Sequence, residues 1–481
     1  MNIRTLSMKE LSDKLNKKEI SAKEVCEEYL EAAEKIDSEI NGFVRFTPDA
    51  AVSQAEKADE KRAKGETMSP LAGVPYGMKD NICTKGSITS CASKMLENFV
   101  PPYDAFVTEK LNDANAVMIG KTNMDEFAMG STTENSAFKV TKNPVDKTRV
   151  PGGSSGGSAA VVKAGEVPFA LGSDTGGSIR QPAAFCGCVG MKPTYGRVSR
   201  SGLVAFASSL DQIGTLTNTV EDSAVVLNVI AGHDENDSTS VNYEKPDFTS
   251  ELNAGVKGMK AALPKEYFAE GISPDVKEAV LNAAKEFEKM GVEVDDVSLP
   301  SLKYALPAYY VISSSEASSN LSRFDGVRYG FRASDYEADD IDDFYKKTRS
   351  EGFGREVKRR IMLGAFALSA GYYDAYYKKA LSVRTVVINN FNSIFKNHDF
   401  VIAPVAPTTA YKIGEKTSDP LQMYLGDIYT VPVNIAGLPG ISLPCGRDKD
   451  NMPIGMQLIG KAFDEVSLYR AANAYEKEAS K

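Results

Sequence analysis

The chain opens with two segments whose apolar positions recur at helical spacing. Ser7 with Glu10, and Ser21 with Glu24, have the spacing of a capping box, in which serine and glutamate satisfy free N–H groups at a helix start. One face of the second predicted helix carries Val25, Tyr29, Ala32, Ala33 and Ile36. We therefore expect residues 1–64 to form an N-terminal helical extension, which serves as a packing layer or as an arm that docks a partner.

From about residue 70 the pattern changes to short apolar runs separated by glycine-rich loops. Residues 117–120 and 167–171 are predicted to be buried strands. Thr122 with Asp125 is expected to start a helix, and a further helix over 155–163 is predicted to begin inside a glycine loop. This alternation of strand, loop and helix predicts a layered α/β fold.

The C-terminal half contains one clear βαβ unit. A strand over 259–264 is followed by a helix that Ser273 caps and Gly291 ends, and residues 292–294 return as a strand. Two late buried strands are expected at residues 401–404 and 441–444.

We find no internal repeat and expect a single domain over residues 1–481. Polar residues dominate the stretch 233–255, which we expect to be a surface connection between two halves. The acidic run over 334–343 is expected to be solvated surface.

Composition argues against several classes of function. The chain has 481 residues and a net charge of −9, so it is a poor stand-alone binder of nucleic acid, whose phosphates require clusters of lysine and arginine. It shows neither a signal peptide nor a run of 18 apolar residues, so we expect no membrane association. Six cysteines without a C-x-x-C pair favour a reducing, cytoplasmic location and no metal site.

Two glycine-rich loops hold Ser154 and Ser178, and an upstream segment holds Lys79. A serine nucleophile needs a base, and the chain has only two histidines, so a lysine is the natural candidate. Burial without a carboxylate partner lowers a lysine pKa from about 10.4 by up to about 3–5 units, which makes the amine a proton acceptor. We therefore predict that Lys79 is buried and hydrogen-bonded to Ser154, which in turn can relay a proton from Ser178.

The loop that ends at Ser178 is also a candidate oxyanion hole. Its small residues allow backbone N–H groups to approach a ligand closely. The N–H groups of Thr175, Gly176, Gly177 and Ser178 are predicted to point at one oxygen. The loss of one such donor costs about 2.7–4 kcal/mol of transition-state stabilisation.

Taken together, these motifs resemble those of the amidase signature family, and the resemblance extends over nearly the whole chain. The matching stretches lie at residues 77–80, 152–158 and 172–183. The resemblance implies an α/β fold with a mixed central β-sheet covered by helices on both faces. It also implies a Ser–cis-Ser–Lys triad, in which Ser178 is the acyl-ester nucleophile, Ser154 follows a cis peptide bond and relays the proton, and Lys79 is the base.

Within that family, later segments are most similar to the glutamine-hydrolysing subunits of tRNA-dependent amidotransferases. These segments lie at residues 314–321, 323–328, 351–354 and 371–377. The resemblance implies a glutaminase that supplies ammonia for converting Glu-tRNA(Gln) to Gln-tRNA(Gln). It implies two partner subunits, one that handles tRNA and uses ATP and Mg, and a second, small one. No cofactor is expected in this chain, and tRNA is expected to be held mainly by the partner.

Glutamine is a free amino acid, so its recognition requires opposite charges for its carboxylate and its ammonium. By resemblance, Arg360 binds the carboxylate, Asp427 binds the ammonium and Tyr309 lines the pocket. Arg359 and Tyr310 are adjacent alternatives for two of these roles.

Other functions remain open from the sequence. A free-standing amidase acting on another small amide is the nearest. An α/β-hydrolase esterase would use the G-x-S-x-G match at 152–156 with His233 or His398 as base. Residues 136–139 fit the S-x-x-K of penicillin-binding enzymes, although no K-T-G follows. A non-enzymatic scaffold would hold phosphate in the glycine loops, although no P-loop motif is present.

Overall fold

A computed structural model describes residues 3–333, 340–416 and 420–480. The strands that it assigns there form one sheet. In chain order they are β1 Phe43–Phe46, β2 Pro75–Lys79, β3 Val117–Thr122, β4 Phe169–Asp174, β5 Val189–Lys192, β6 Gln212–Thr217, β7 Lys260–Pro264, β8 Glu293–Val297, β9 Phe400–Pro404, β10 Gly440–Arg447 and β11 Pro453–Gly460. Across the sheet the order is β1-β3-β2-β4-β6-β5-β10-β11-β9-β7-β8.

The sheet is mixed, as expected. Strand β2 pairs in parallel with both β3 and β4, whereas β4 with β6 and β10 with β11 are antiparallel. Because parallel strands end at the same edge, Lys79 at the end of β2 and the loop after Asp174 at the end of β4 lie on one side of the sheet. This edge brings the predicted chemistry together.

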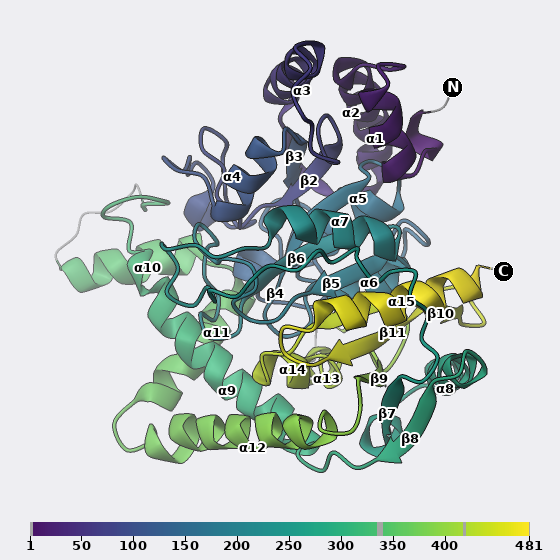
Figure 1. Ribbon diagram of the computed structural model, residues 1–481. Coiled ribbons are helices and arrows are strands. Elements are labelled where there is room, and N and C mark those ends of the chain that lie inside the picture. The colour runs from purple at the N-terminus through teal and green to yellow at the C-terminus, as the bar shows by residue number, and fades with distance from the viewer. Residues whose placement is uncertain (1–2, 334–339, 417–419, 481) are drawn as a thin grey trace.

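Helices surround the sheet (Figure 1). The α-helices are α1 Met8–Asn16, α2 Ala22–Ile40, α3 Pro48–Ala63, α4 Phe106–Asp113, α5 Gly156–Lys163, α6 Arg180–Cys186, α7 Val220–Ile230, α8 Pro274–Lys289, α9 Leu302–Asn320, α10 Ile341–Gly352, α11 Arg355–Leu368, α12 Lys379–Ile394, α13 Pro420–Leu425, α14 Val431–Ile435 and α15 Glu465–Ala479. Short 3₁₀ turns are η1 Ile3–Thr5, η2 Lys94–Leu96, η3 Glu126–Ala128, η4 Lys265–Phe268 and η5 Leu321–Arg323, and η6 Asp374–Lys378 is a π-helix.

Alternating residues of one strand show that both faces of the sheet are covered. In β9, Phe400 and Ile402 belong to one buried apolar cluster, which also includes residues of α2, α7, α8 and α15. Val401 and Ala403 belong to a second cluster with residues of α9, α12 and α14. Since successive side chains of a strand point to opposite faces, the two clusters are the cores on the two faces. The predicted fold class is confirmed.

The N-terminal segment follows the sequence closely. Both capping boxes are present, with Ser7 and Glu10 at the start of α1 and Ser21 and Glu24 at the start of α2. Besides its helices, the segment 1–64 contributes β1, which pairs with β3 at the end of the sheet. The division into one domain with a helical extension stays a prediction.

Several later predictions are also confirmed. The βαβ unit appears as β7, α8 and β8, and the two late strands appear as β9 and β10. Residues 233–255 contain neither helix nor strand. Of the acidic run, residues 334–339 lie outside the described residues. No helix that the structure describes is both long enough and apolar enough to cross a membrane.

The prediction of a helix that starts at Thr122 and Asp125 is wrong. Only the three-residue turn η3 follows, because Phe127 and Ala128 adopt left-handed conformations with φ of 49° and 63°. The Asp125 carboxylate does not cap a helix but accepts hydrogen bonds from the N–H groups of Thr132 and Thr133. The hydrogen bonding of this buried loop outweighs the local capping pattern.

Candidate active site

Lys79 is fully buried at the end of β2 and faces hydroxyl groups. Its Nζ lies 2.8 Å from Ser154 Oγ, 2.7 Å from Ser155 Oγ and 2.9 Å from Ser173 Oγ. Burial lowers the pKa of Lys79 to about 7, against the opposing effect of the Asp125 charge. The predicted burial and the predicted hydrogen bond to Ser154 are both confirmed.

Ser154 is held through the backbone on both of its sides. The Gly153–Ser154 peptide bond is cis, as the resemblance implied. The Gly153 N–H donates to Gln181 Oε1 of α6 at 2.9 Å, and the Asp125 N–H donates to the Ser154 carbonyl at 3.2 Å. A Cβ at position 153 would overlap the Asp125 carboxylate, so this position requires glycine.

Ser178 lies on the second loop, next to the first. The Ser155 N–H donates to the Ser178 carbonyl at 3.1 Å, which ties the two glycine-rich loops together. Ser178 is 8% exposed, whereas Lys79 and Ser154 are completely enclosed. Of the three triad candidates, Ser178 is therefore the one that a small substrate can reach.

A buried ion pair shapes the loop around Ser178. The Asp174 carboxylate accepts hydrogen bonds from the N–H groups of Gly177 at 2.7 Å and Ile179 at 3.1 Å, and from Arg180 Nε at 3.1 Å. Burial alone would raise the pKa of Asp174, but Arg180 and further donors bring it down to about 2. Asp174 therefore remains an anion that fixes the turn from β4 into α6.

The predicted oxyanion donors divide into two groups. The Gly177 N–H is paired with Asp174, whereas the described residues supply no acceptor for the N–H groups of Thr175, Gly176 and Ser178. Tyr309 closes the space over Gly176, because a Cβ at position 176 would lie 2.6 Å from the Tyr309 hydroxyl oxygen. The predicted wall residue Tyr309 thus lies directly on the loop that carries Ser178.

Asp427 lies in a shell of hydroxyl donors. Ser131 Oγ is 2.9 Å and 3.0 Å from its two carboxylate oxygens, and the Tyr310 hydroxyl donates to Oδ2 at 2.9 Å. Burial raises the pKa of Asp427 to about 6, with Tyr310 and Ser131 opposing the rise. Both tyrosines considered from the sequence therefore lie at the site. Tyr309 lies over Gly176, and Tyr310 donates a hydrogen bond to Asp427.

Arg360 points inward and Arg359 outward from α11. Arg360 is 3% exposed, its Nε lies 2.7 Å from Glu356 Oε1, and its guanidinium is 4.7 Å from the ring centres of both Tyr310 and Tyr424. Arg359 pairs with the other oxygen of Glu356 and is partly exposed. Burial therefore distinguishes the two adjacent arginines, and Arg360 is the one beside the tyrosine that binds Asp427.

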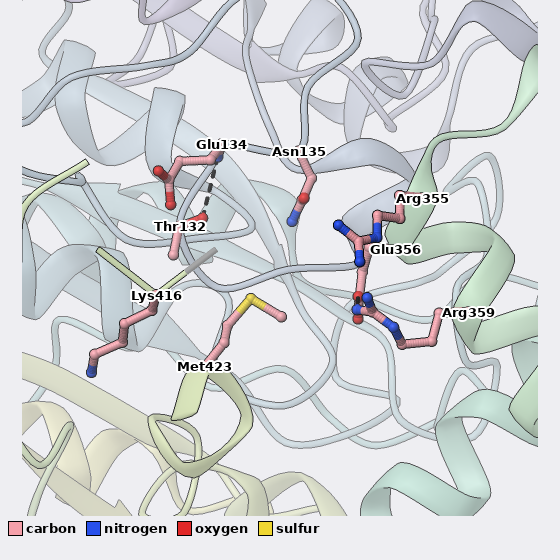
Figure 2. Close-up of a pocket in the computed structure, with 8 residues that line it drawn as sticks. All are labelled: Thr132, Glu134, Asn135, Arg355, Glu356, Arg359, Lys416 and Met423. Atoms are coloured by element: carbon pink, nitrogen blue, oxygen red, sulfur yellow. Dashed lines mark hydrogen bonds and ion pairs between the residues drawn. The ribbon is translucent and has the colours of Figure 1, made fainter. Parts of the chain in front are cut away.

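A surface pocket is lined in part by Glu356, the residue that contacts Arg360 (Figure 2). Its wall includes Arg355, Glu356 and Arg359 from α11, facing Thr132 of the loop that follows Ser131. The complete lining is Thr132, Glu134, Asn135, Arg355, Glu356, Arg359, Lys416 and Met423. Neither the triad candidates nor Arg360, Asp427 and Tyr309 belong to this wall, and the pocket meets the site through Glu356, which contacts Arg360.

Neither histidine takes part in this arrangement. His398 contacts Ile394 and Asp295, which belong to α12 and to the edge strand β8, and His233 is exposed. Lys139 of the S-x-x-K match pairs with Asp37 instead of a serine. In the part of the chain that the structure describes, no group of three His, Cys, Asp or Glu side chains is placed to hold a metal ion.

Sequence reasoning missed several residues that surround the predicted ones. Ser155 and Ser173 touch the Lys79 amine, Ser131 touches Asp427, and Glu356 touches Arg360. Ser155 and Ser173 lie in or beside the glycine-rich motifs, so their position was a usable signal. Ser131 lies 296 residues from Asp427 in the chain, and nothing local announces that contact.

Comparisons with known proteins agree with this geometry. A family model described as Amidase matches residues 24–469. The chain is 59% identical to the A subunit of the glutamyl-tRNA(Gln) amidotransferase of Staphylococcus haemolyticus, over 99% of this chain and 98% of that protein. It is also 59% identical to the protein of the same name from Geobacillus thermodenitrificans, over 98% of this chain and 96% of that one.

Solved structures give the same result. The crystal structure of the glutamyl-tRNA(Gln) amidotransferase A subunit from Thermotoga maritima is 44% identical, with a TM-score of 0.79, and the match covers 99% of this chain and 95% of that one. A bacterial aryl acylamidase of the amidase signature family is 26% identical, with a TM-score of 0.87 over 99% and 96% of the two chains.

Proposed function

This chain belongs to the amidase family, and we propose that within it the protein is the glutamine-hydrolysing subunit of a tRNA-dependent amidotransferase. One observation carries the chemistry: the enclosed Lys79 amine is surrounded by serine hydroxyls. Burial in this setting lowers the pKa of Lys79 to about 7, which suits a general base that works at neutral pH.

In the proposed reaction, neutral Lys79 takes a proton from Ser154, and Ser154 takes one from Ser178. The Ser178 oxygen attacks the side-chain amide carbon of glutamine. The N–H groups of Thr175, Gly176 and Ser178 stabilise the oxyanion, while Gly177 holds the turn through Asp174. The proton returns through Ser154 to the amide nitrogen, the C–N bond breaks and ammonia leaves. Water then hydrolyses the acyl ester and releases glutamate.

Recognition residues supply the charges that glutamine requires. Arg360 binds the α-carboxylate and Asp427 binds the ammonium. The Ser131 and Tyr310 hydroxyls support the ionised form of Asp427, and Tyr309 closes the pocket over Gly176. We assign the pocket of Figure 2 as the route by which glutamine enters, because it is lined by residues adjacent to these groups.

The released ammonia serves, in this proposal, to convert Glu-tRNA(Gln) to Gln-tRNA(Gln). One partner subunit binds tRNA and carries out the ATP- and Mg-dependent step, and a second, small subunit completes the assembly. The acidic net charge supports this division, because tRNA requires a basic surface elsewhere. All six cysteines are unpaired, which supports a cytoplasmic location.

The test is Ser178→Ala in the complex assembled from the chain and its partner subunits. We expect glutamine-dependent amidation to fall by about 10⁴-fold or more, because the nucleophile is gone. Amidation driven by added ammonium chloride should be unchanged, because the partner's chemistry survives. If ammonia does not rescue the variant, the division of labour is wrong.

A free-standing amidase is the remaining alternative. It predicts full turnover of a small amide without any partner and no response to Glu-tRNA(Gln). Glutaminase assays of the isolated chain and of the assembled complex, each with and without Glu-tRNA(Gln) and ATP, distinguish the two. A stimulation on assembly supports the proposal, and equal rates in all four conditions support the alternative.

A further inference from the structure

Helix α11 has two different faces. Its inner face buries Glu356, Val357, Arg360, Gly364 and Ala367, two of which belong to the recognition site. Its outer face leaves large apolar side chains in water, with Met362 72% exposed, Leu363 46% and Phe366 48%. Amphipathic helices normally bury such residues, so this outer face lacks its cover in the isolated chain.

The segment after α11 extends the same surface. The π-helix η6 contains no buried residue, and Tyr372 and Tyr376 are each 44% exposed. Phe366 contacts the rings of both tyrosines, at centroid distances of 4.5 Å and 5.8 Å. We call this continuous surface the α11–η6 face and define it as Met362, Leu363, Phe366, Tyr372 and Tyr376.

Residues 371–377 were singled out by the sequence, yet none of them takes part in the proposed catalysis. The segment is exposed along its length, apart from the partly covered Tyr377. π-Helical turns occur frequently at functional sites. A π-helix that is rich in tyrosine and contains no buried residue is therefore more consistent with binding than with packing.

The charges around this face indicate its partner. Residues 355–379 contain six lysines or arginines and two acidic residues, in a chain whose net charge is −9. Both acidic residues, Glu356 and Asp374, are paired within the segment. With Arg360 buried against Glu356, the exposed charges of this segment are still mostly basic, and they complement an apolar surface bordered by carboxylates.

We propose that the α11–η6 face docks a partner protein subunit of the amidotransferase, whose matching surface is apolar with an acidic rim. Exposed Tyr, Phe and Met are the residues enriched in protein interfaces. Met362 and Leu363 fit a protein better than RNA, which is bound through stacking platforms and phosphate contacts. The inference rests on the proposed function, because that function requires a second chain.

Docking here would reach the recognition site through one helix. Arg360 on the inner face of α11 and Phe366 on the outer face are joined by less than two turns. A subunit that covers the outer face restricts the movement of α11 and hence of Arg360. This provides a physical link between assembly and the binding of glutamine.

The experiment compares Phe366→Glu with Val100→Glu, because both side chains are 48% exposed and only Phe366 belongs to the face. Each variant is titrated with the partner subunits, and complex formation is followed by sedimentation velocity. We expect Phe366→Glu to raise the Kd of assembly by about 30-fold or more, as for a central interface residue. Val100→Glu should remain within about threefold of the unmodified chain.

Two further variants serve as controls for this experiment. Tyr376→Glu should weaken assembly like Phe366→Glu, whereas Phe366→Leu, which keeps an apolar side chain, should largely retain it. Glutaminase activity of each free variant should be unchanged, which shows that the chain is folded and that the proposed function is intact. Normal assembly of both glutamate variants would overturn the inference. Normal assembly with weakened tRNA binding would assign the face to RNA and would also overturn it.

Discussion

The proposed reaction centre around Lys79 and the proposed recognition site around Arg360 and Asp427 are both buried, but their surroundings act on charge in opposite ways. Around Lys79, the contacting side chains are the hydroxyls of Ser154, Ser155 and Ser173. A neutral amine is cheaper to bury than an ammonium, so burial there favours the base. Arg360 and Asp427, by contrast, have partners whose charge or hydrogen bonds replace the water lost on burial, and these partners favour the charged forms.

This contrast fits the role proposed for each region. The proposed base has to lose its charge near neutral pH, and the side chains that contact Lys79 are neutral hydroxyls. A binding site for a zwitterion must keep its charges, so Arg360 pairs with Glu356 and Asp427 accepts bonds from Ser131 and Tyr310. Burial therefore lowers the pKa of Lys79 to about 7, whereas beside Arg360 and Asp427 the partner groups support the charged forms.

The largest effect is expected when a permanent charge is placed at position 79, because the proposed base could then no longer accept a proton. Lys79→Arg keeps a long cationic side chain, but a guanidinium cannot give up its proton in a protein. We expect kcat for glutamine hydrolysis to fall by about 10²–10⁴-fold, the contribution of a positioned general base. Steady-state glutaminase kinetics measure this. An activity above about a tenth of the unmodified rate would show that residue 79 is not the base.

The recognition site should respond differently, through binding rather than chemistry. Asp427→Asn removes the charge that is assigned to the glutamine ammonium, so we expect kcat/KM for glutamine to fall by about 30-fold or more. Glutaramate, which is glutamine without its α-amino group, should lose much less. The ratio of kcat/KM for the two substrates is the measurement.

A matched control uses the other end of the substrate. Arg360→Met should reduce kcat/KM for glutamine by a similar factor, but should spare 4-aminobutanamide, which lacks the α-carboxylate. If both variants affect every substrate equally, the assignment of the two charges is wrong, and both residues act only on structure.

A smaller effect is expected when the charged residue stays and only a hydrogen-bond donor to it is removed. Ser131→Ala takes one hydroxyl donor from Asp427, whose pKa is already raised to about 6. The pKa should rise further, so a larger fraction of Asp427 is protonated at pH 7 and KM for glutamine increases by about tenfold. Because deprotonation restores the anion, the difference should shrink at about pH 8.5. A KM increase that is independent of pH would contradict this role.

Local features of the fold could be predicted from the sequence. The capping boxes at Ser7 and Ser21, and the βαβ unit around α8, follow from patterns of a few residues and are present as expected. The helix expected at Asp125 failed, since its carboxylate satisfies a loop that closes only in the folded chain. Short-range patterns describe competing local structures, and tertiary hydrogen bonds decide between them.

The site shows the same division. Scarcity of histidine and the glycine-rich loops were enough to predict a buried Lys79 bonded to Ser154. Adjacent alternatives such as Arg359 and Arg360 could not be separated by type or spacing, because only packing determines which one faces inward. The contact between Ser131 and Asp427 joins distant parts of the chain, and one sequence contains no signal for it.

The most direct test of the account is the protonation of Lys79 itself. Lysine side chains labelled with ¹³C at Cε can be titrated by NMR, and the Lys79 signal is assigned by its absence in Lys79→Met. This assignment is needed because burial also lowers the pKa of Lys121, and that of Lys192 to about 7. We expect Lys79 to titrate near a pKa of about 7 and to be largely neutral one pH unit above it. A Lys79 signal that stays protonated up to about pH 10, the ordinary range for lysine, would contradict it.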